Sequence, residues 1–277
     1  MNAEKPTTVY YFRFSLGQRY LHGVLIVIFL GLAATGMTLR FSDTPWAQAV
    51  SDAIGFRAVL FFHKFCAVVL TGGFLLHLCD VFYRGLLRGQ TNILYGPDSL
   101  VPRPQDLIDL YEHVRWFLWL GPRPRFSRFT YWEKFDYWAV FWGMAIIGIS
   151  GYMIWFAPFF ARFVPGYGMN VALLVHGEEG LLAVWFIFII HFFNTHLRPE
   201  KFPLDAVIIT GRLSGDELRH ERPIEYESLV EHDGLKSIET GAPPRWLMNF
   251  AGIIAVLAIG VGFILVFVTL TAFFAGA

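Results

Sequence analysis

Five long apolar stretches constrain this chain more than any other feature. Each holds about 20 or more residues, the length that a helix needs to cross ~30 Å of hydrocarbon. Inside a membrane the backbone must satisfy its own hydrogen bonds, which favours helices over open strands. The stretches cover residues 21–39, 59–83, 137–158, 171–193 and 247–274. Since 55% of the chain is hydrophobic and 18% aromatic, we expect an all-α, polytopic membrane protein.

The Lys and Arg residues gather on one predicted side of the membrane. Three precede the first apolar stretch, eight lie between the second and third, and seven lie between the fourth and fifth. The other side holds only Arg40, Arg57, Lys64 and Arg162. Cytoplasmic loops of membrane proteins carry an excess of Lys and Arg. We therefore expect a cytoplasmic N-terminus and a C-terminus on the opposite face.

Composition excludes several other classes of function. Lys plus Arg and Asp plus Glu each number 22, so the net charge gives no reason to expect a nucleic-acid partner. The two cysteines, Cys66 and Cys79, share one apolar stretch, and the sequence has no Cys-x-x-Cys-His motif. Neither covalently attached haem nor an iron–sulfur cluster is therefore expected. A redox centre in this chain would need other ligands.

Histidines in the apolar stretches are the main candidates for such ligands. Six of the nine histidines lie in or beside these stretches, where ionisable side chains are costly and commonly functional. They are His22, His63, His77, His176, His191 and His196.

The spacing of four of these histidines suggests a cofactor. His63 and His77 are 14 residues apart, and His176 and His191 are 15 apart. On straight α-helices these spacings give ~21 Å and ~22 Å of rise with ~40° and ~60° of rotation. Two helices would each present one imidazole near either membrane surface. Imidazoles that face each other can hold a haem iron between them.

Residues 12–196 resemble the cytochrome b subunit of formate dehydrogenase and of nickel–iron hydrogenase. The resemblance rests on the segments RFSLGQRYLHGVLIVIFLGLAATGMTLRF, FFHKF and WGMAIIGISGYMIWFAPFFARFVPGYGMNVALLVHGEEGLLAVWFIFIIHFFNTH. Its marks are Arg19-x-x-His22, Gly36, His63, Gly151, His176 and His191.

The resemblance implies a four-helix membrane bundle that holds two non-covalent b haems. His63 and His176 would hold the outer haem, and His22 and His191 the inner one. It further implies a bacterial cytoplasmic (inner) membrane and electron transfer between a periplasmic redox partner and the quinone or menaquinone pool. That partner would be an iron–sulfur or multihaem c-type cytochrome subunit on the outer face, in a complex with its own catalytic subunit. In that membrane, the orientation predicted from the basic residues makes the C-terminus periplasmic.

The sequence departs from that family in three ways. The 15-residue spacing of His176 and His191 exceeds the family's spacing by one residue. His77 has no counterpart, and it is an alternative to His22 as the inner ligand or a ligand to a third haem. The last apolar stretch lies outside the resemblance. We therefore expect a four-helix cytochrome b domain (1–200), a cytoplasmic loop that docks a partner (201–245) and a fifth, C-terminal membrane helix (246–277).

A quinone site needs an apolar slot with a few polar groups beside the inner haem. The candidates are Asn194, His196 and Asp80, although Asp80 can also simply pair with Arg84 at (i, i+4). Two other functions remain open. One is a self-contained transmembrane b-type reductase, and the other is a transporter or proton channel that uses a histidine relay.

Overall fold

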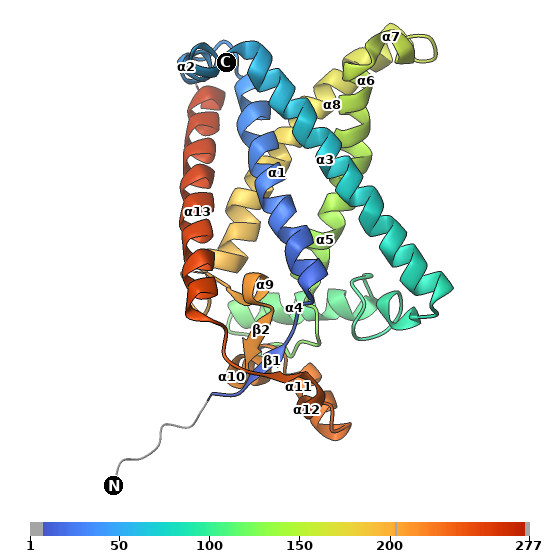
Figure 1. Ribbon diagram of the computed structural model, residues 1–277, viewed down its shortest axis with the longest axis vertical. Helices are drawn as coiled ribbons and strands as arrows, with labels where there is room; N and C mark the ends of the chain where they lie inside the picture. The colour runs from blue at the N-terminus through green and yellow to red at the C-terminus, as the bar shows by residue number, and fades with distance from the viewer. Residues whose placement is uncertain (1–7, 203, 275–277) are drawn as a thin grey trace. The chain divides into compact units, whose positions relative to one another are not determined.

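The computed structural model describes residues 8–202 and 204–274. Its dominant feature is five helical segments that are long and apolar enough to cross a membrane (Figure 1): Leu16–Arg40, Phe56–Leu87, Tyr131–Trp155, Gly166–Leu197 and Arg245–Phe274. The prediction of five membrane helices is confirmed at this level. Each helix begins before the apolar stretch from which it was predicted, and the third ends at Trp155 rather than at Pro158.

Contacts between residues divide the chain into two compact units, each assembled from three separate stretches. Unit 1 combines the described residues of Met1–Arg19, His77–Trp138 and Ala206–Asn249. Unit 2 combines Tyr20–Leu76, Ala139–Asp205 and the described residues of Phe250–Ala277. Four of the five divisions fall inside membrane spans, and the fifth lies between Asp205 and Ala206.

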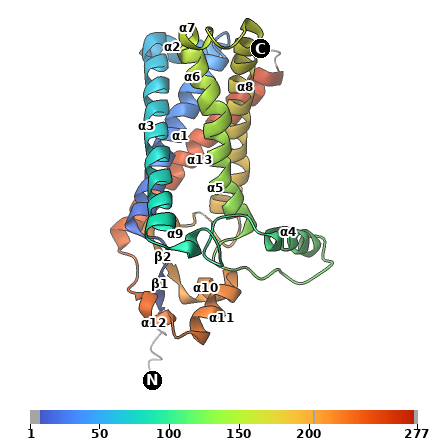
Figure 2. The same ribbon diagram turned by 90° about the vertical axis from the view of Figure 1, so that its right-hand side faces the viewer.

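Unit 2 contains most of the membrane helices. Its elements are α1 (Leu16–Arg40, from Tyr20 onward), α2 (Pro45–Ile54), α3 (Phe56–Phe82, to Leu76), the end of α5 (Tyr131–Gly143), α6 (Ile149–Trp155), α7 (Ala157–Phe160), α8 (Gly166–Trp185) and α13 (Arg245–Phe274, from Phe250). Figure 2 shows the long helices α1, α3, α8 and α13 running lengthwise, with the short α2 and α7 at one end. The short α2 was not predicted, because ten residues are too few to cross a membrane; Pro45 at its start favours a helix N-terminus.

The core of unit 2 joins α1, α8 and α13. Buried side chains from these helices and the continuation of α8 form one cluster: Ala33, Met37, Phe41, Leu181, Val184, Phe188, Phe192, Ala258, Leu265 and Ala272. Small residues on α13 allow close approach, and a Cβ at Gly262 would lie 2.5 Å from the Phe188 ring. The opposite face of α13 exposes large apolar side chains such as Val256 and Phe267, as a lipid-facing surface does. The fifth helix is thus packed on the first and fourth spans.

Four π-helical segments interrupt or extend the spans. They are η1 (Tyr83–Leu87), η3 (Met144–Gly148), η4 (Phe186–His191) and η5 (Phe193–Leu197). A π-helical turn accommodates one residue more than an α-helical turn and is frequent at functional sites. A further short helix, η2 (Thr91–Ile93), is of the 3-10 type.

Unit 1 holds a small sheet that an all-α prediction did not include. β1 (Tyr10–Phe12) pairs antiparallel with β2 (Arg212–Ser214) and with β3 (Glu239–Thr240), in the order β2-β1-β3. Strands of two or three residues, 200 positions apart in the chain, carry no recognisable alternation in the sequence. The rest of unit 1 is helical, with α4 (Pro104–Phe117), α9 (Val207–Thr210), α10 (Gly215–Glu221), α11 (Pro223–Glu231) and α12 (Leu235–Ile238).

The segment expected as a docking loop, 201–245, is folded within unit 1 from Ala206 onward. Val207, Leu213 and Leu218 form its buried core, against which Tyr11 and Phe14 pack. A capping box at Ser214 and Glu217 begins α10. Three charged residues of this segment, Arg222, Glu225 and Glu227, form ion pairs with other stretches of unit 1.

Those ion pairs connect three distant parts of the chain. The Glu225 carboxylate accepts one hydrogen bond from Arg13 and another from Arg128, each with an N–O distance of 2.8 Å. Glu133 accepts from Arg222 at 2.9 Å. Burial lowers the pKa of the Arg222 guanidinium, and the negative charge of Glu133 opposes that shift. A charge buried beside opposite charges stays ionised, so these pairs hold the stretches of unit 1 together.

Candidate functional site

Unit 2 brings four of the six candidate histidines together in two pairs. His63 of α3 faces His176 of α8, with ring centres 6.2 Å apart and ring planes at 87°. His22 of α1 faces His191 at the end of η4, with ring centres 6.4 Å apart and planes at 41°. These are the two pairs that the family resemblance implied.

The separation within each pair fits a metal ion held between two imidazoles. A metal–nitrogen bond to histidine is about 2 Å long, and the ring centre lies about 1 Å beyond the nitrogen. Two axial imidazoles on one ion therefore have ring centres about 6 Å apart, close to the 6.2 and 6.4 Å found here.

Each pair supplies only two ligands. Within residues 8–202 and 204–274, no cluster of three or more His, Cys, Asp or Glu side chains could hold a metal ion. A metal at either pair would therefore take its remaining ligands from another molecule. A porphyrin supplies four, which leaves two axial positions for histidine.

Hydrogen bonds orient the first pair. Nδ1 of His176 lies 2.9 Å from the carbonyl oxygen of Ile147, which can only accept, so this nitrogen carries the proton. Nδ1 of His63 lies 3.0 Å from the Thr35 hydroxyl, which already donates to the Gly31 carbonyl at 2.6 Å and therefore accepts from the ring. Both rings thus keep the Nε2 lone pair available for a metal, as metal-binding histidines anchored through the other nitrogen do.

Two glycines make room for the same rings. A Cβ at Gly36 would lie 3.1 Å from Cε1 of His63, and a Cβ at Gly151 would lie 2.8 Å from Cε1 of His176. Real Cβ atoms essentially never approach as closely as 2.8 Å, so a larger residue at Gly151 would displace the His176 imidazole. At Gly36 the His63 ring would have to shift by a few tenths of an ångström. By contrast, a Cβ at Gly72 or Gly73 would have no atom within 4 Å. Gly36 and Gly151 are therefore the glycines that position the first pair.

The second pair depends on a π-helical segment. On a straight α-helix, the 15 residues from His176 to His191 would turn His191 ~60° away from His176. η4 lies between them and ends at His191, and a π-helical turn absorbs one extra residue. The 15-residue spacing is then equivalent to 14 residues of α-helix, the spacing of the resembling family. The sequence alone gave no sign of this insertion.

His77 has a different partner. Its Nε2 lies 2.9 Å from the Tyr137 hydroxyl, and both residues belong to unit 1. The nitrogen that would bind a metal is thus engaged in a hydrogen bond. Asp80, a quinone candidate, lies 3.5 Å from Arg84 in an (i, i+4) ion pair. This ion pair with Arg84 is the structural role that we expected from the sequence as the alternative to quinone binding.

The other two quinone candidates lie on η5, close to His191. Asn194 and His196 are both half-buried in unit 2. The His196 ring packs against Phe192, with ring centres 5.1 Å apart. Two polar side chains therefore share one helical turn just beyond the second histidine pair.

Some residues of the site were not found from the sequence. Thr35 and the Ile147 carbonyl anchor the first pair, although neither residue type marks a site by itself. Arg40 donates to Glu178 at 2.8 Å, one turn or less from His176 on α8. Trp142 donates to Glu179 at 3.2 Å. A polar residue at the level of a histidine on a neighbouring span is the signal that could have indicated Thr35.

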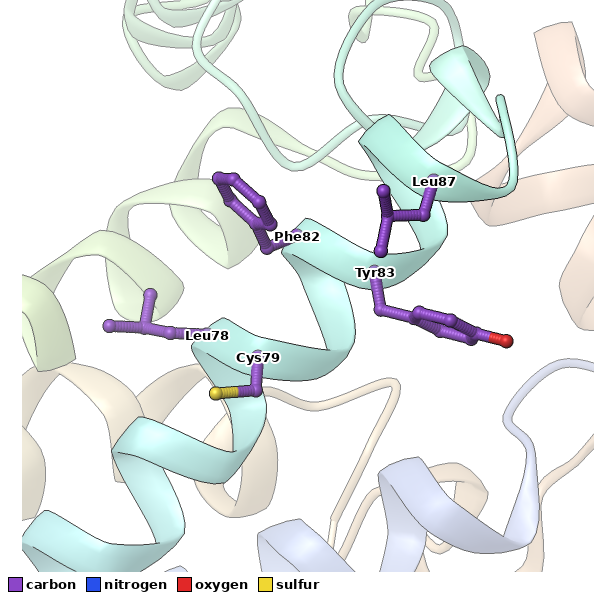
Figure 3. A pocket seen from close by; sticks show the side chains of 5 residues that line it. All are labelled: Leu78, Cys79, Phe82, Tyr83 and Leu87. Atoms are coloured by element: carbon purple, nitrogen blue, oxygen red, sulfur yellow. The ribbon is translucent and has the colours of Figure 1, made fainter.

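A pocket on α3 is separate from the histidine pairs. The pocket is open and apolar and has a volume of about 320 Å³. It is lined by Leu78, Cys79, Phe82, Tyr83 and Leu87 (Figure 3). All five come from α3 and its continuation η1, so the pocket is the grooved surface of a single helix. None of the six candidate histidines lines it.

No protein-family model matches this chain, and no curated protein matches it.

Proposed function

We propose that this chain is a membrane electron-transfer subunit that carries two b-type haems. The observation that carries the proposal is the presence of two histidine pairs at the separation of axial ligands. The orientation of the first pair by Thr35 and Ile147 supports it, as does the resemblance of residues 12–196 to formate dehydrogenase and hydrogenase cytochromes b.

The proposed ligands are His63 with His176 and His22 with His191. Haem supplies one-electron transfer when it is bound. The chain's own residues fix the two sites at different levels, because His176 and His191 lie roughly 20 Å apart along one helix. Two sites at this separation would connect the two surfaces of the membrane.

Orientation in a bacterial inner membrane follows from the basic residues. The stretches rich in Lys and Arg would be cytoplasmic, which puts His63 and His176 at the periplasmic level and His22 and His191 at the cytoplasmic level. A periplasmic iron–sulfur or c-type cytochrome subunit would exchange electrons at the outer pair. Quinone would bind at the inner level, where Asn194 and His196 can contact its carbonyl groups and Asp80 is a third candidate.

Electron transfer across a vesicle membrane tests this function. The purified chain is placed in liposomes with menaquinol, and ferricyanide is added outside as an impermeant acceptor. Each quinol releases two electrons and two protons, so it should reduce two ferricyanide ions. We expect His63→Ala and His22→Ala each to abolish the reaction, and His232→Ala, on an exposed helix of unit 1, to leave it unchanged. Equal rates in all variants would contradict the proposal.

Purification decides between a subunit and a self-contained reductase. A subunit should copurify with stoichiometric redox partners from its native membrane. A chain that purifies alone and still reduces a small soluble acceptor would be the self-contained b-type reductase. A chain without haem that conducts protons would instead favour the histidine relay.

A further inference from the structure

The helix α4 of unit 1 carries an exposed apolar face. Six apolar or aromatic side chains lie within about 120° of one another around its axis, because successive residues of an α-helix turn by about 100°. They are 41% to 72% exposed: Leu107, Leu110, Tyr111, Val114, Phe117 and Leu118, the last directly after the helix. Another side of α4 carries Asp106 and Asp109, which are buried. A contiguous apolar face of this length is unfavourable in water and marks a surface that another molecule covers.

An ion pair and a hydrogen bond hold α4 against the beginning of the third span. Lys134, in the first turn of α5, is almost fully buried and donates to both carboxylate oxygens of Asp106, at 2.7 and 2.9 Å. The hydroxyl of Tyr131, the first residue of α5, lies 3.0 Å from Nδ1 of His113. All four residues belong to unit 1, and Figures 1 and 2 show α4 running across the direction of the beginning of α5. The helix is therefore fixed where the third span begins, and it lies across that span.

This end of the third span has the composition of a membrane surface. Its beginning carries two tyrosines and two tryptophans: Tyr131, Trp132, Tyr137 and Trp138. Tyr and Trp gather where a span meets the lipid headgroups, because their rings are apolar and their polar atoms reach water. Nε1 of Trp138 donates to the carbonyl oxygen of Leu100, in the stretch that leads to α4, at 3.0 Å. The apolar face of α4 is thus held at the level of the headgroups.

The end of α4 adds an exposed tryptophan and an arginine. Trp119 directly follows the end of the helix, has a φ of 55° and is 92% exposed. Glycine is the usual residue there, because a bulky residue is disfavoured at positive φ. A tryptophan in this position is suited to a membrane surface, where its amphipathic ring is favoured. The Arg115 guanidinium lies over the Tyr111 ring, 5.8 Å from its centre, so it extends from the edge of the apolar face as arginines beside lipid do.

We propose that α4 is an interfacial helix, whose apolar face is covered by the lipid bilayer while Arg115 binds headgroup phosphates. Lipid is the occupant because α4 is fixed beside a membrane span at the level where lipid surrounds that span. Phe135, on the beginning of α5, is 60% exposed and extends the lipid-facing surface to this level. The inference needs only the membrane spans and does not depend on haem binding. It assigns the connection between the second and third spans a place on the membrane surface.

Spin labels on α4 measure where the face lies. The full chain with Cys66→Ala and Cys79→Ala is placed in nanodiscs of phosphatidylcholine and phosphatidylglycerol, and carries one label at a time through Val114→Cys, Leu118→Cys or Glu112→Cys. Oxygen, which concentrates in lipid, and a nickel chelate, which stays in water, then compete to relax each label. We expect the labels at 114 and 118 to lie about 5–10 Å into the boundary between headgroups and acyl chains. Glu112 is exposed on the polar side of the same helix, so its label is the matched control and should meet the nickel chelate.

Two results of this measurement would overturn the proposal. Labels at 114 and 118 that meet the nickel chelate as readily as the label at 112 would place the face in water. Labels shielded from both reagents would show that protein, such as a second copy of this chain, covers the face instead of lipid.

A charged substitution gives an independent test. Val114→Glu places a carboxylate in the apolar face, which lipid disfavours, so hydrogen exchange of residues 104–118 in nanodiscs should become faster than in the wild type. Glu112→Gln, on the polar side, should exchange like the wild type. Exchange that is equal in all three proteins would contradict the contact with lipid.

Discussion

At the scale of single residues, the first histidine pair is defined by its hydrogen bonds as much as by its rings. The Thr35 hydroxyl and the Ile147 carbonyl each accept a hydrogen bond from an Nδ1–H group. Such bonds fix the ring orientation and increase the basicity of the nitrogen that binds a metal. Only the bond to Thr35 can be removed by a substitution, because its acceptor is a side chain. The acceptor of the other bond is the backbone carbonyl of Ile147.

Replacing Thr35 should shift the potential of one haem. Thr35→Val removes the acceptor of the His63 Nδ1 proton and makes the ring less basic. Ferric iron is then less stabilised, so we expect the midpoint potential of the outer haem to rise by about 20–60 mV, which corresponds to one hydrogen bond. Optical redox titration measures this shift. Thr271→Val, at an exposed threonine whose hydroxyl bonds to its own helix, should have no effect. A shift of both haems, or a fall in potential, would contradict this account.

Adding one methyl group should displace a ligand. A Cβ at Gly151 would lie 2.8 Å from Cε1 of His176, so Gly151→Ala forces the imidazole to move. We expect loss of one haem per chain, or a large change in its spectrum, with the protein still folded. The control is Gly72→Ala, where the new methyl group meets no atom within 4 Å. Haem content that is equal in the two variants would show that His176 is not held as described.

At the scale of elements, the π-helical segment η4 explains a spacing that did not fit the resemblance. The six histidines, their spacing and the five spans could all be read from the sequence, because apolar stretches and ionisable residues inside them are strong signals. The position of His191 around its helix could not. A π-helical turn is set by packing with neighbouring helices and has no reliable sequence signature.

Changing the length of this span tests the role of η4. Deleting Ile190 should convert the π-helical turn to an α-helical one without moving the residues beyond it, so both haems should remain. Inserting one alanine after Leu182, in regular α-helix, should rotate His191 by about 100° and remove one haem. Haemochrome spectra of the two variants give the comparison. If the deletion loses a haem and the insertion does not, the register described here is wrong.

At the scale of the whole molecule, unit 1 shows the limit of sequence-based reasoning. Its sheet joins Tyr10–Phe12 to strands more than 200 residues later, and its ion pairs join Arg13, Arg128 and Glu225. Pairing between residues so far apart in the sequence depends on how the intervening chain folds. We expected residues 201–245 to be a loop that docks a partner, although Arg222 and Glu225 of this segment are buried in ion pairs within unit 1.

The buried ion pairs should be essential to unit 1. Glu225→Gln leaves Arg13, which is almost fully buried, with only the more distant Glu133, at 3.9 Å, as a charged partner. Breaking one side of a buried pair costs about 3 kcal/mol, and we expect faster hydrogen exchange and proteolysis at residues 206–240. Glu227→Gln breaks an exposed pair with Arg125 and should cost less than about 1 kcal/mol. Similar protection in both variants would show that the cluster does not stabilise the unit.

The haem-to-chain ratio tests the central claim most directly. A pyridine haemochrome assay is made on the wild type, His63→Ala, His22→Ala, His77→Ala and the exposed control His232→Ala. The account predicts two b haems per wild-type chain, one haem in each of the His63 and His22 variants, and two in the His77 and His232 variants. Loss of a haem with His77 but not with His22 would move the inner site to His77. A wild-type chain without haem would contradict the electron-transfer function altogether.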